Sequence, residues 1–281
     1  MSQANECIWC QAALKRDLIW QQIFCFKPLS FDCLCPICRS LFIAYHRSDT
    51  ACQTCGRAVT LCEEPWENVF SHEKNYMYGF EVAVTKEGAT SKKILCFDCV
   101  RWLKTYPIDL LTHDALLEYG EVFREWLYRY KYRGDYRLRQ IVAEPLKLAY
   151  QQYKDYQWLI LPSSPKSLQE RRFHATAGLL DVAGIPFVNP LTYIGDGIKQ
   201  SQKTRLERLN LLNPFDISHE NLGRLSRKLL IFDDVYTTGA TLMSAKHLLT
   251  KKDKESAANT DKLTIKSLSL ARDSQSTDLK N

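Results

Sequence analysis

Eight of the eleven cysteines in this 281-residue chain fall into four Cys-x-x-Cys pairs, which are Cys7/Cys10, Cys35/Cys38, Cys52/Cys55 and Cys96/Cys99. Zinc takes four thiolates in a tetrahedron, and two such pairs that face each other supply them. Neighbours in the sequence are the simplest partners. The first two pairs therefore predict one structural Zn²⁺ site, and the last two pairs predict another. A cross-braced pairing, first with third and second with fourth, stays open, and Cys33 could replace a ligand of the first site.

A second group of residues that could do chemistry lies between Leu229 and Leu242, where an apolar run leads into two acids and a hydroxyl-rich turn. A turn at a helix N-terminus presents unpaired N–H groups and the positive end of the helix dipole to an anion. Gly239 would let the backbone approach that anion closely. Asp233 and Asp234 would repel a bare phosphate, so ribose hydroxyls or a magnesium shell suit them better. The segment therefore predicts a site for a sugar phosphate.

The composition is that of an ordinary folded protein, with 45% hydrophobic and 25% charged residues. No apolar run approaches the roughly 20 residues of a membrane span. The N-terminus lacks the basic start and apolar stretch of a signal peptide, so we expect a cytoplasmic protein without a transmembrane segment. The formal charge is +6, and two four-thiolate zinc sites of net charge −2 each would lower it to about +2. Net charge alone is thus weak support for a nucleic-acid partner.

The elements that must position these groups fall into two predicted domains. All cysteines precede residue 100, which predicts a small cysteine-rich double zinc-ribbon domain over residues 1–112 and a second domain over residues 113–281. In the second domain, strands are expected to alternate with helices, which predicts an α/β fold with a parallel sheet flanked by helices. Residues 273–281 are expected to form a disordered tail. The expected strands are Asp114–Tyr119, Trp158–Leu161, one within Pro186–Ile194, Leu229–Val235 and Leu263–Ala271, and the expected helices include Glu121–Tyr132, Leu138–Tyr153, one ending near Val182, and Ala240–Leu249.

The segment that ends at Leu242 resembles the signature of type I phosphoribosyltransferases, which bind phosphoribosyl pyrophosphate (PRPP). This resemblance implies a type I phosphoribosyltransferase-like fold and a PRPP site that uses Mg²⁺. It implies that Asp233 and Asp234 are the catalytic acids, which hold the ribose hydroxyls. The loop after the first core strand, with Ser163 and Ser164, is similar to the loop beside the pyrophosphate, and Lys131 could supply the cation that this group needs. The residues implied to hold the 5-phosphate are Val235, Tyr236, Thr237, Thr238, Gly239, Ala240 and Thr241.

Zinc knuckles followed by this signature resemble the ComF (ComFC) family of late competence proteins over nearly the whole chain. Cys7–Cys10 opens the chain as in that family, and Phe24–Leu29 is similar to the apolar stretch that follows. Tyr130–Asp135 resembles the family's Phe-Lys-Phe-x-Gly-Asp segment, and Gln200–Arg205 resembles its basic loop. Arg171–Ala175 departs from the family's Arg-Gly-Phe-Asn-Gln, because only its first and third residues match.

The ComF resemblance implies a cytoplasmic factor that handles incoming single-stranded DNA in natural transformation. It also implies partners, such as a DNA-translocating helicase, and peripheral contact with the membrane uptake machinery. An active phosphoribosyltransferase with an unidentified acceptor is the alternative, and a regulator that only senses PRPP is a third hypothesis. The stretch Tyr128–Arg139 interleaves aromatics with cations, which suits single-stranded nucleic acid but also fits a solvated helix face. Lys199–Arg208 is expected to be a mobile loop that could close on either ligand or stay solvated.

Overall fold

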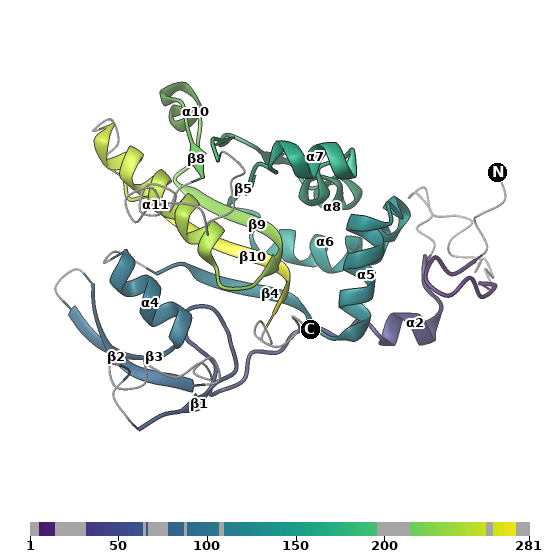
Figure 1. The fold of residues 1–281 in the computed structure, drawn as a ribbon, viewed down its shortest axis with the longest axis horizontal. Coiled ribbons are helices and arrows are strands. Elements are labelled where there is room, and N and C mark those ends of the chain that lie inside the picture. The colour runs from purple at the N-terminus through teal and green to yellow at the C-terminus, as the bar shows by residue number, and fades with distance from the viewer. Residues whose placement is uncertain are drawn as a thin grey trace.

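The computed structural model describes residues 6–14, 32–63, 66, 78–86, 89–106, 110–195, 214–256 and 261–273. A five-stranded parallel sheet, in the order β4-β10-β9-β5-β6, lies at its centre (Figure 1). This confirms the predicted fold class, a parallel α/β sheet flanked by helices and preceded by cysteine clusters. The strands are β4 (Thr112–Glu118), β5 (Gln157–Ile160), β6 (Phe187–Val188), β9 (Lys228–Tyr236) and β10 (Thr264–Arg272).

Both faces of this sheet are covered, which explains why its central strands are apolar without alternation. In β9, Leu229 and Ile231 belong to one core, while Leu230 and Phe232 belong to the other. The first core also contains residues of α4 (Phe97–Thr105) and α11 (Ala240–Glu255). The second core contains residues of α5 (Glu121–Tyr132), α6 (Ala143–Gln152) and α8 (Ala175–Ala183).

Two expected helices are interrupted for reasons of backbone chemistry. Over Leu138–Tyr153 the chain forms a 3₁₀ turn, η2 (Tyr136–Val142), and only then α6. Pro145 lies in the first turn of α6, where its missing N–H is tolerated, whereas a continuous helix would set its ring against the carbonyl four residues earlier. The next expected helix is divided into α7 (Pro165–Arg171) and α8, because Arg172 adopts a left-handed φ of 62°.

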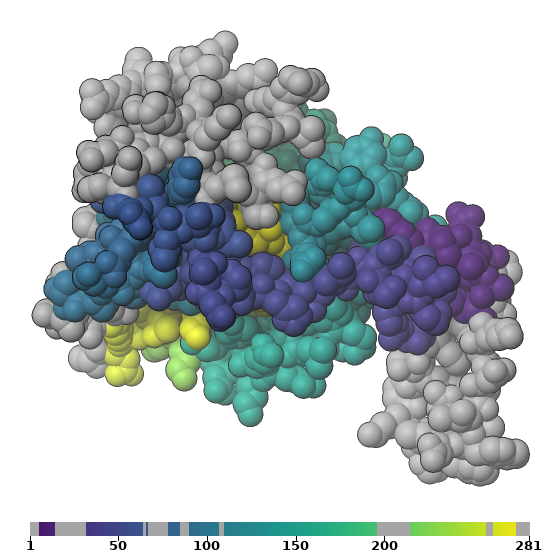
Figure 2. Space-filling view, turned by 90° about the horizontal axis from the view of Figure 1, so that it is seen from below, coloured from purple at the N-terminus to yellow at the C-terminus, as the bar shows by residue number. Residues whose placement is uncertain are grey.

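The N-terminal part contains a short helix and a small sheet. The sheet has the order β1-β2-β3, with β1 parallel and β3 antiparallel to β2, and it leads directly into α4. Before β1, the chain runs along the outer edge of β4. There Tyr45 donates its N–H to Leu116 O at 2.9 Å, and Glu118 donates its N–H to Ile43 O at 2.9 Å. Figure 2 shows this segment as a band across one face of the molecule. The elements are α2 (Pro36–Ser40), β1 (Thr60–Leu61), β2 (Tyr78–Lys86) and β3 (Ala89–Cys96).

Smaller elements complete the described chain. β7 (Thr192–Tyr193) pairs antiparallel with β8 (Phe215–Asp216), and α10 (His219–Gly223) follows β8. None of the helices that the structure describes has the length and apolarity needed to cross a membrane. The first core contains residues from both sides of position 112, so the predicted domain boundary stays a prediction.

Candidate functional site

The eight predicted ligand cysteines gather in two groups of four, and each group joins two pairs that are neighbours in the sequence. We call these groups site 1 (Cys7, Cys10, Cys35, Cys38) and site 2 (Cys52, Cys55, Cys96, Cys99). The cross-braced pairing does not occur, and within the described residues Cys33 joins neither group.

The sulfur positions test whether zinc fits. Within each site, the four sulfurs lie within 4.8 Å of one another. Four sulfurs about 2.3 Å from a tetrahedral zinc would lie about 3.8 Å apart. The Sγ–Sγ distance is 3.8 Å between Cys10 and Cys35 and 3.5 Å between Cys55 and Cys96. Both groups therefore fit structural zinc, with all four positions filled by thiolates.

Sites 1 and 2 are built from the same two pieces. In the first piece, a turn closed by an antiparallel bridge carries one cysteine pair. The residue after that pair has a positive φ, 63° at Gln11 and 76° at Gly56. In the second piece, the pair begins a helix, with Cys35 as the N-cap of α2 and Cys96 as the N-cap of α4. The positive end of each helix dipole thus faces the thiolates and favours their negative charge.

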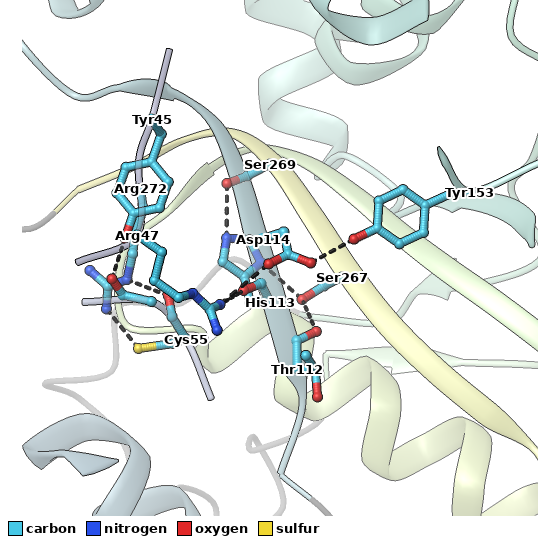
Figure 3. Close-up of polar contacts among 11 residues, drawn as sticks. Tyr45, Arg47, Cys55, Thr112, His113, Asp114, Tyr153, Ser267, Ser269 and Arg272 are labelled. Carbon is cyan, nitrogen blue, oxygen red and sulfur yellow. Dashed lines mark hydrogen bonds and ion pairs between the residues drawn. The ribbon is translucent and has the colours of Figure 1, made fainter. Parts of the chain in front are cut away.

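The two sites differ in their surroundings. In site 1, Cys10 is exposed and Cys35 is partly exposed, whereas all four cysteines of site 2 are buried. Arg272, at the end of β10, donates from Nε to Cys55 O at 2.8 Å and from Nη2 to Cys55 Sγ at 3.0 Å (Figure 3). A guanidinium against a thiolate offsets the net negative charge of a four-thiolate zinc site. The central sheet therefore supplies a hydrogen-bond donor to one of the cysteines of site 2.

Further polar contacts join the ribbon around site 2 to the sheet (Figure 3). His113 of β4 donates its backbone N–H to Thr54 O at 2.9 Å, and Arg47 Nη2 donates to the backbone O of His113 at 2.6 Å. The imidazole lies 2.9 Å from Ser267 Oγ and 3.0 Å from Ser269 Oγ, both on β10. Burial lowers the pKa of His113 to about 3. His113 is thus a neutral structural link and does not titrate near neutral pH.

The predicted phosphate loop lies where β9 ends and α11 begins. β9 ends at Tyr236, and Gly239, with φ 77°, is the N-cap of α11. A glycine has no side chain to cap the helix, so the first-turn N–H groups are left for an anion. Thr237 is exposed, whereas Thr238 and Ala240 are partly buried. The sequence motif therefore adopts the strand-turn-helix geometry that an anion site requires.

The side chain of Tyr236 turns under this loop. Tyr236 is only 2% exposed, and its ring centroid lies 4.1 Å from that of His113. The Arg272 guanidinium lies 5.2 Å from the centroid of the same ring. A Cβ on Gly239 would collide with the Tyr236 hydroxyl. Any contribution of Tyr236 to the predicted ligand site must therefore come from its backbone.

Of the two predicted catalytic acids near the end of β9, Asp234 is buried and Asp233 is partly buried. Asp234 Oδ2 lies 2.5 Å from Nζ of Lys131, which reaches across from α5. Asp233 Oδ1 accepts the N–H of Asp234 at 2.9 Å. Burial and then the adjacent Asp234 raise the pKa of Asp233 to about 7, although Lys131 opposes this shift. One acid is therefore ion-paired, and the other gains or loses its proton near neutral pH.

The predicted pyrophosphate loop follows β5. Strands β5 and β9 are parallel neighbours, and Ile160 pairs with Phe232. Ser163 and Ser164 therefore follow their strand at the same carboxyl edge of the sheet as Asp233. The Ser164 hydroxyl already caps α7. This edge is where open parallel sheets bind their ligands.

Sequence reasoning missed one residue beside the loop. Trp102 of α4, only 6% exposed, donates its indole N–H to Thr238 O at 2.7 Å. The two residues are 136 positions apart, and no local pattern connects them. Other predictions fall outside the described residues and stay predictions. They concern Phe24–Leu29, Lys199–Arg208 and the tail after residue 273.

Comparison with known proteins adds a family to this geometry. The chain is 34% identical over 154 residues to the competence protein ComFC of Streptococcus pneumoniae, across 55% of this chain and 68% of that protein. The chain belongs to the ComFC family. It is also 25% identical over 260 residues to the ComFC of Bacillus subtilis, across 90% of this chain and 92% of that protein. No protein-family model matches the chain. The resemblance predicted from the knuckles and the phosphate loop is confirmed, and it supports a role in competence.

Proposed function

We propose that this ComFC family member binds PRPP with Mg²⁺ at the β9–α11 loop and handles single-stranded DNA during natural transformation. The observation that carries the PRPP site is the position of Asp233 and Asp234. They lie near the end of a central parallel strand, before the helix whose N-cap position is Gly239. In this proposal, the helix N-terminus takes the 5-phosphate, and the acids take the ribose hydroxyls. Mg²⁺, a hard cation that prefers oxygen ligands, would be coordinated by the pyrophosphate oxygens.

Lys131 has a defined part in the proposed binding event. Its ammonium group lies 2.5 Å from Asp234. Ribose hydroxyls that donate to Asp234 would replace that contact and free the ammonium for the pyrophosphate, which carries more negative charge. Lys131 would then act as a cation that changes partners when PRPP enters. We expect Lys131→Met to weaken PRPP binding while leaving the zinc content at two per chain.

Single-stranded DNA is the proposed partner of the outer face of α5. Tyr128 and Tyr132 are 47% and 65% exposed, and their ring centroids lie 5.8 Å apart. The Arg133 guanidinium lies 5.4 Å from the Tyr128 centroid, and that of Arg171 lies 5.4 Å from the Tyr132 centroid. Exposed rings beside cations are the combination that stacks bases and follows phosphates. Tyr130 is fully buried and belongs to the core.

The cellular setting extends this proposal. The competence names of both relatives support it. We infer a cytoplasmic location, cooperation with other competence proteins such as a DNA-translocating helicase, and peripheral contact with the membrane uptake machinery.

Calorimetric titration of the purified protein with PRPP and Mg²⁺ tests the first ligand. We expect binding that needs Mg²⁺ and that Asp234→Asn weakens at least about tenfold, because a charge-assisted hydrogen bond contributes about 1.5–3 kcal/mol. A wild-type protein that binds no PRPP would refute the site.

Titration with an oligothymidylate tests the second ligand. We expect salt-dependent binding that Tyr132→Leu weakens about fivefold or more, since one stacked base is worth about 1–3 kcal/mol. Tyr78→Leu is the matched control, because Tyr78 is 38% exposed and lies in the ribbon, on β2. Sequence-specific binding to duplex DNA would instead favour a regulator that senses PRPP.

An active phosphoribosyltransferase is the second candidate, and Asp233 favours it. A carboxyl group with a pKa of about 7 can take a proton from an acceptor at neutral pH. Release of pyrophosphate from PRPP that depends on an added base would support this candidate. Binding of PRPP without release across a panel of bases would leave the chain as a PRPP-binding protein.

A further inference from the structure

The contact between Trp102 and the phosphate loop connects site 2 to the predicted PRPP site. α4 begins at the ligand Cys96 and carries the ligand Cys99 in its first turn. Trp102 follows Cys99 by three residues, so the two side chains lie on one face of the helix. The indole N–H of Trp102 ends on Thr238 O at 2.7 Å. One short helix therefore connects a metal ligand to the backbone of the loop.

This contact sets the direction of a loop N–H group. A trans peptide holds its C=O and its N–H on opposite sides. Because Thr238 O points to Trp102, the N–H of Gly239 in the same peptide unit points away from α4. The loop is thereby held with the Gly239 N–H pointing away from α4. Without the indole N–H, the Thr238 carbonyl loses its partner, and this peptide unit can rotate.

A second connection between site 2 and the loop runs through Arg272 and Tyr236. Arg272 donates two hydrogen bonds to Cys55, another ligand of site 2. The same guanidinium lies 5.2 Å from the ring centroid of Tyr236. Tyr236 in turn occupies the space beneath Gly239. Site 2 thus contacts the loop through α4 on one side and through Arg272 and Tyr236 on the other.

From these two connections we infer that site 2 positions the phosphate loop, with Trp102 as the positioning residue, so that zinc occupancy of site 2 and anion binding at the loop are linked. Site 1 has no such connection among the described residues. Ordering of the loop by site 2 is the first part of this inference, and it needs no ligand. Its second part, an effect on PRPP affinity, rests on the proposed function. Linkage is reciprocal, so PRPP bound at the loop must also raise the zinc affinity of site 2 by the same factor.

Hydrogen exchange tests the first part in the zinc-loaded full chain without PRPP. Trp102→Phe keeps an aromatic ring and removes the indole donor. We expect the peptide that begins at Met243, whose N–H donates to Gly239 O at 2.8 Å, to exchange about 3- to 10-fold faster, the range for one net hydrogen bond. Trp126→Phe is the matched control, because Trp126 is fully buried and donates to Leu138 O at 3.0 Å, away from the loop. Equal exchange of this peptide in wild type and Trp102→Phe would overturn the inference whether or not PRPP binds.

Equilibrium competition with a chromogenic chelator tests the second part. The Cys10→Ser variant, which disables site 1, identifies the zinc of site 2. We expect saturating PRPP with Mg²⁺ to raise the zinc affinity of site 2 alone, by about 3- to 10-fold. PRPP that binds but changes neither zinc affinity, or changes both equally, contradicts the linkage. Faster exchange of the peptide that begins at Met243 in Trp102→Phe, together with no PRPP binding by the wild type, would retain the positioning role and reject the proposed ligand.

Discussion

Sites 1 and 2 use the same two pieces in different settings. Each combines a turn that carries one cysteine pair with a helix that begins at another. Site 1 is half-buried, because Cys7 and Cys38 belong to the second core whereas Cys10 is exposed. Site 2 is buried, is bonded by Arg272 and lies next to the phosphate loop. Both sites contribute cysteines to a core that also contains strands of the central sheet. The comparison teaches that similar metal-binding units can differ in their neighbours, because among the described residues only site 2 is bonded by the central sheet and connected to the loop.

The largest expected effect comes from removing one ligand from each site. Cys99→Ser should lower the melting temperature by roughly 10 °C or more, because all four cysteines of site 2 are buried in the first core. Cys10→Ser should lower it by only a few degrees, since Cys10 is exposed and forms no part of the core. Thermal melting monitored by circular dichroism checks this prediction, with one zinc per chain expected in each variant by metal analysis. Equal losses of stability would erase the difference between the two settings.

The ion pairs beside the two sites should differ almost as much. Arg57 and Asp98 lie 3.0 Å apart beside site 2, and both side chains are 1% exposed. Arg57→Met leaves the buried Asp98 carboxylate with Arg101, at 3.4 Å, as its ion-pair partner among the described residues, and should cost about 3 kcal/mol. Arg39 pairs with Asp32 near site 1, where the side chains are 58% and 72% exposed. Arg39→Met should therefore change stability by less than about 0.5 kcal/mol, as measured by denaturant unfolding.

An outer-shell change should separate the zinc affinities of the two sites. Arg272→Met removes two donors from Cys55 and should weaken zinc binding at site 2 about 10- to 100-fold. Arg129→Met is the matched control. Its guanidinium lies 4.7 Å from the ring centroid of Trp9, in the site 1 turn, and donates to none of the described sulfurs. Competition with a chelator should show site 1 unchanged in both variants. A loss of site 1 zinc in Arg272→Met would indicate general unfolding instead.

The smallest expected effect is a pH-dependent gain in stability at the loop beside site 2. Asp233 has a folded-state pKa of about 7, above its ordinary value of 3.8. The stability that follows from this raised pKa is present in full below pH 4 and is lost as the pH rises through about 7. Asp233→Asn avoids the cost of the buried carboxylate and keeps an acceptor for the Asp234 N–H. The full shift would correspond to about 4 kcal/mol. Asp233 is only partly buried, and solvent screening reduces this value, so the variant should gain about 1–2 kcal/mol over the wild type at pH 8 and almost nothing near pH 4. A gain that is equal at both pH values would exclude Asp233 as its source.

Much of this molecule could be predicted from local patterns in the sequence. The buried stripe of α5, together with Gly134-Asp135 after it, predicted the observed bounds, Glu121–Tyr132. The Cys-x-x-Cys spacing identified all eight clustered cysteines, because each pair is a local structure. The strand-turn-helix around Gly239 was likewise visible in the residue types.

The remaining features depend on contacts between distant residues. Trp102 and Thr238 are separated by 136 positions, and Arg272 and Cys55 by 217. The sequence around Trp102 or Arg272 contains no pattern that predicts its partner, because a buried tryptophan or an arginine at a strand end can pack in many ways. Lys131 was expected near the ligand site, but its direct pairing with Asp234 depends on how α5 packs on the sheet.

The position of β10 in the sheet has a consequence for the order in which a newly made chain can fold. β10 is the last described strand in the sequence, yet it lies between β4 and β9 and pairs with both. Until the ribosome has released it, β4 cannot be joined to the rest of the sheet, and Cys55 lacks Arg272. The emerging ribbon and helices would therefore expose apolar surface until β10 has emerged and inserted between β4 and β9, and exposed apolar surface of this kind favours aggregation of a partly folded chain.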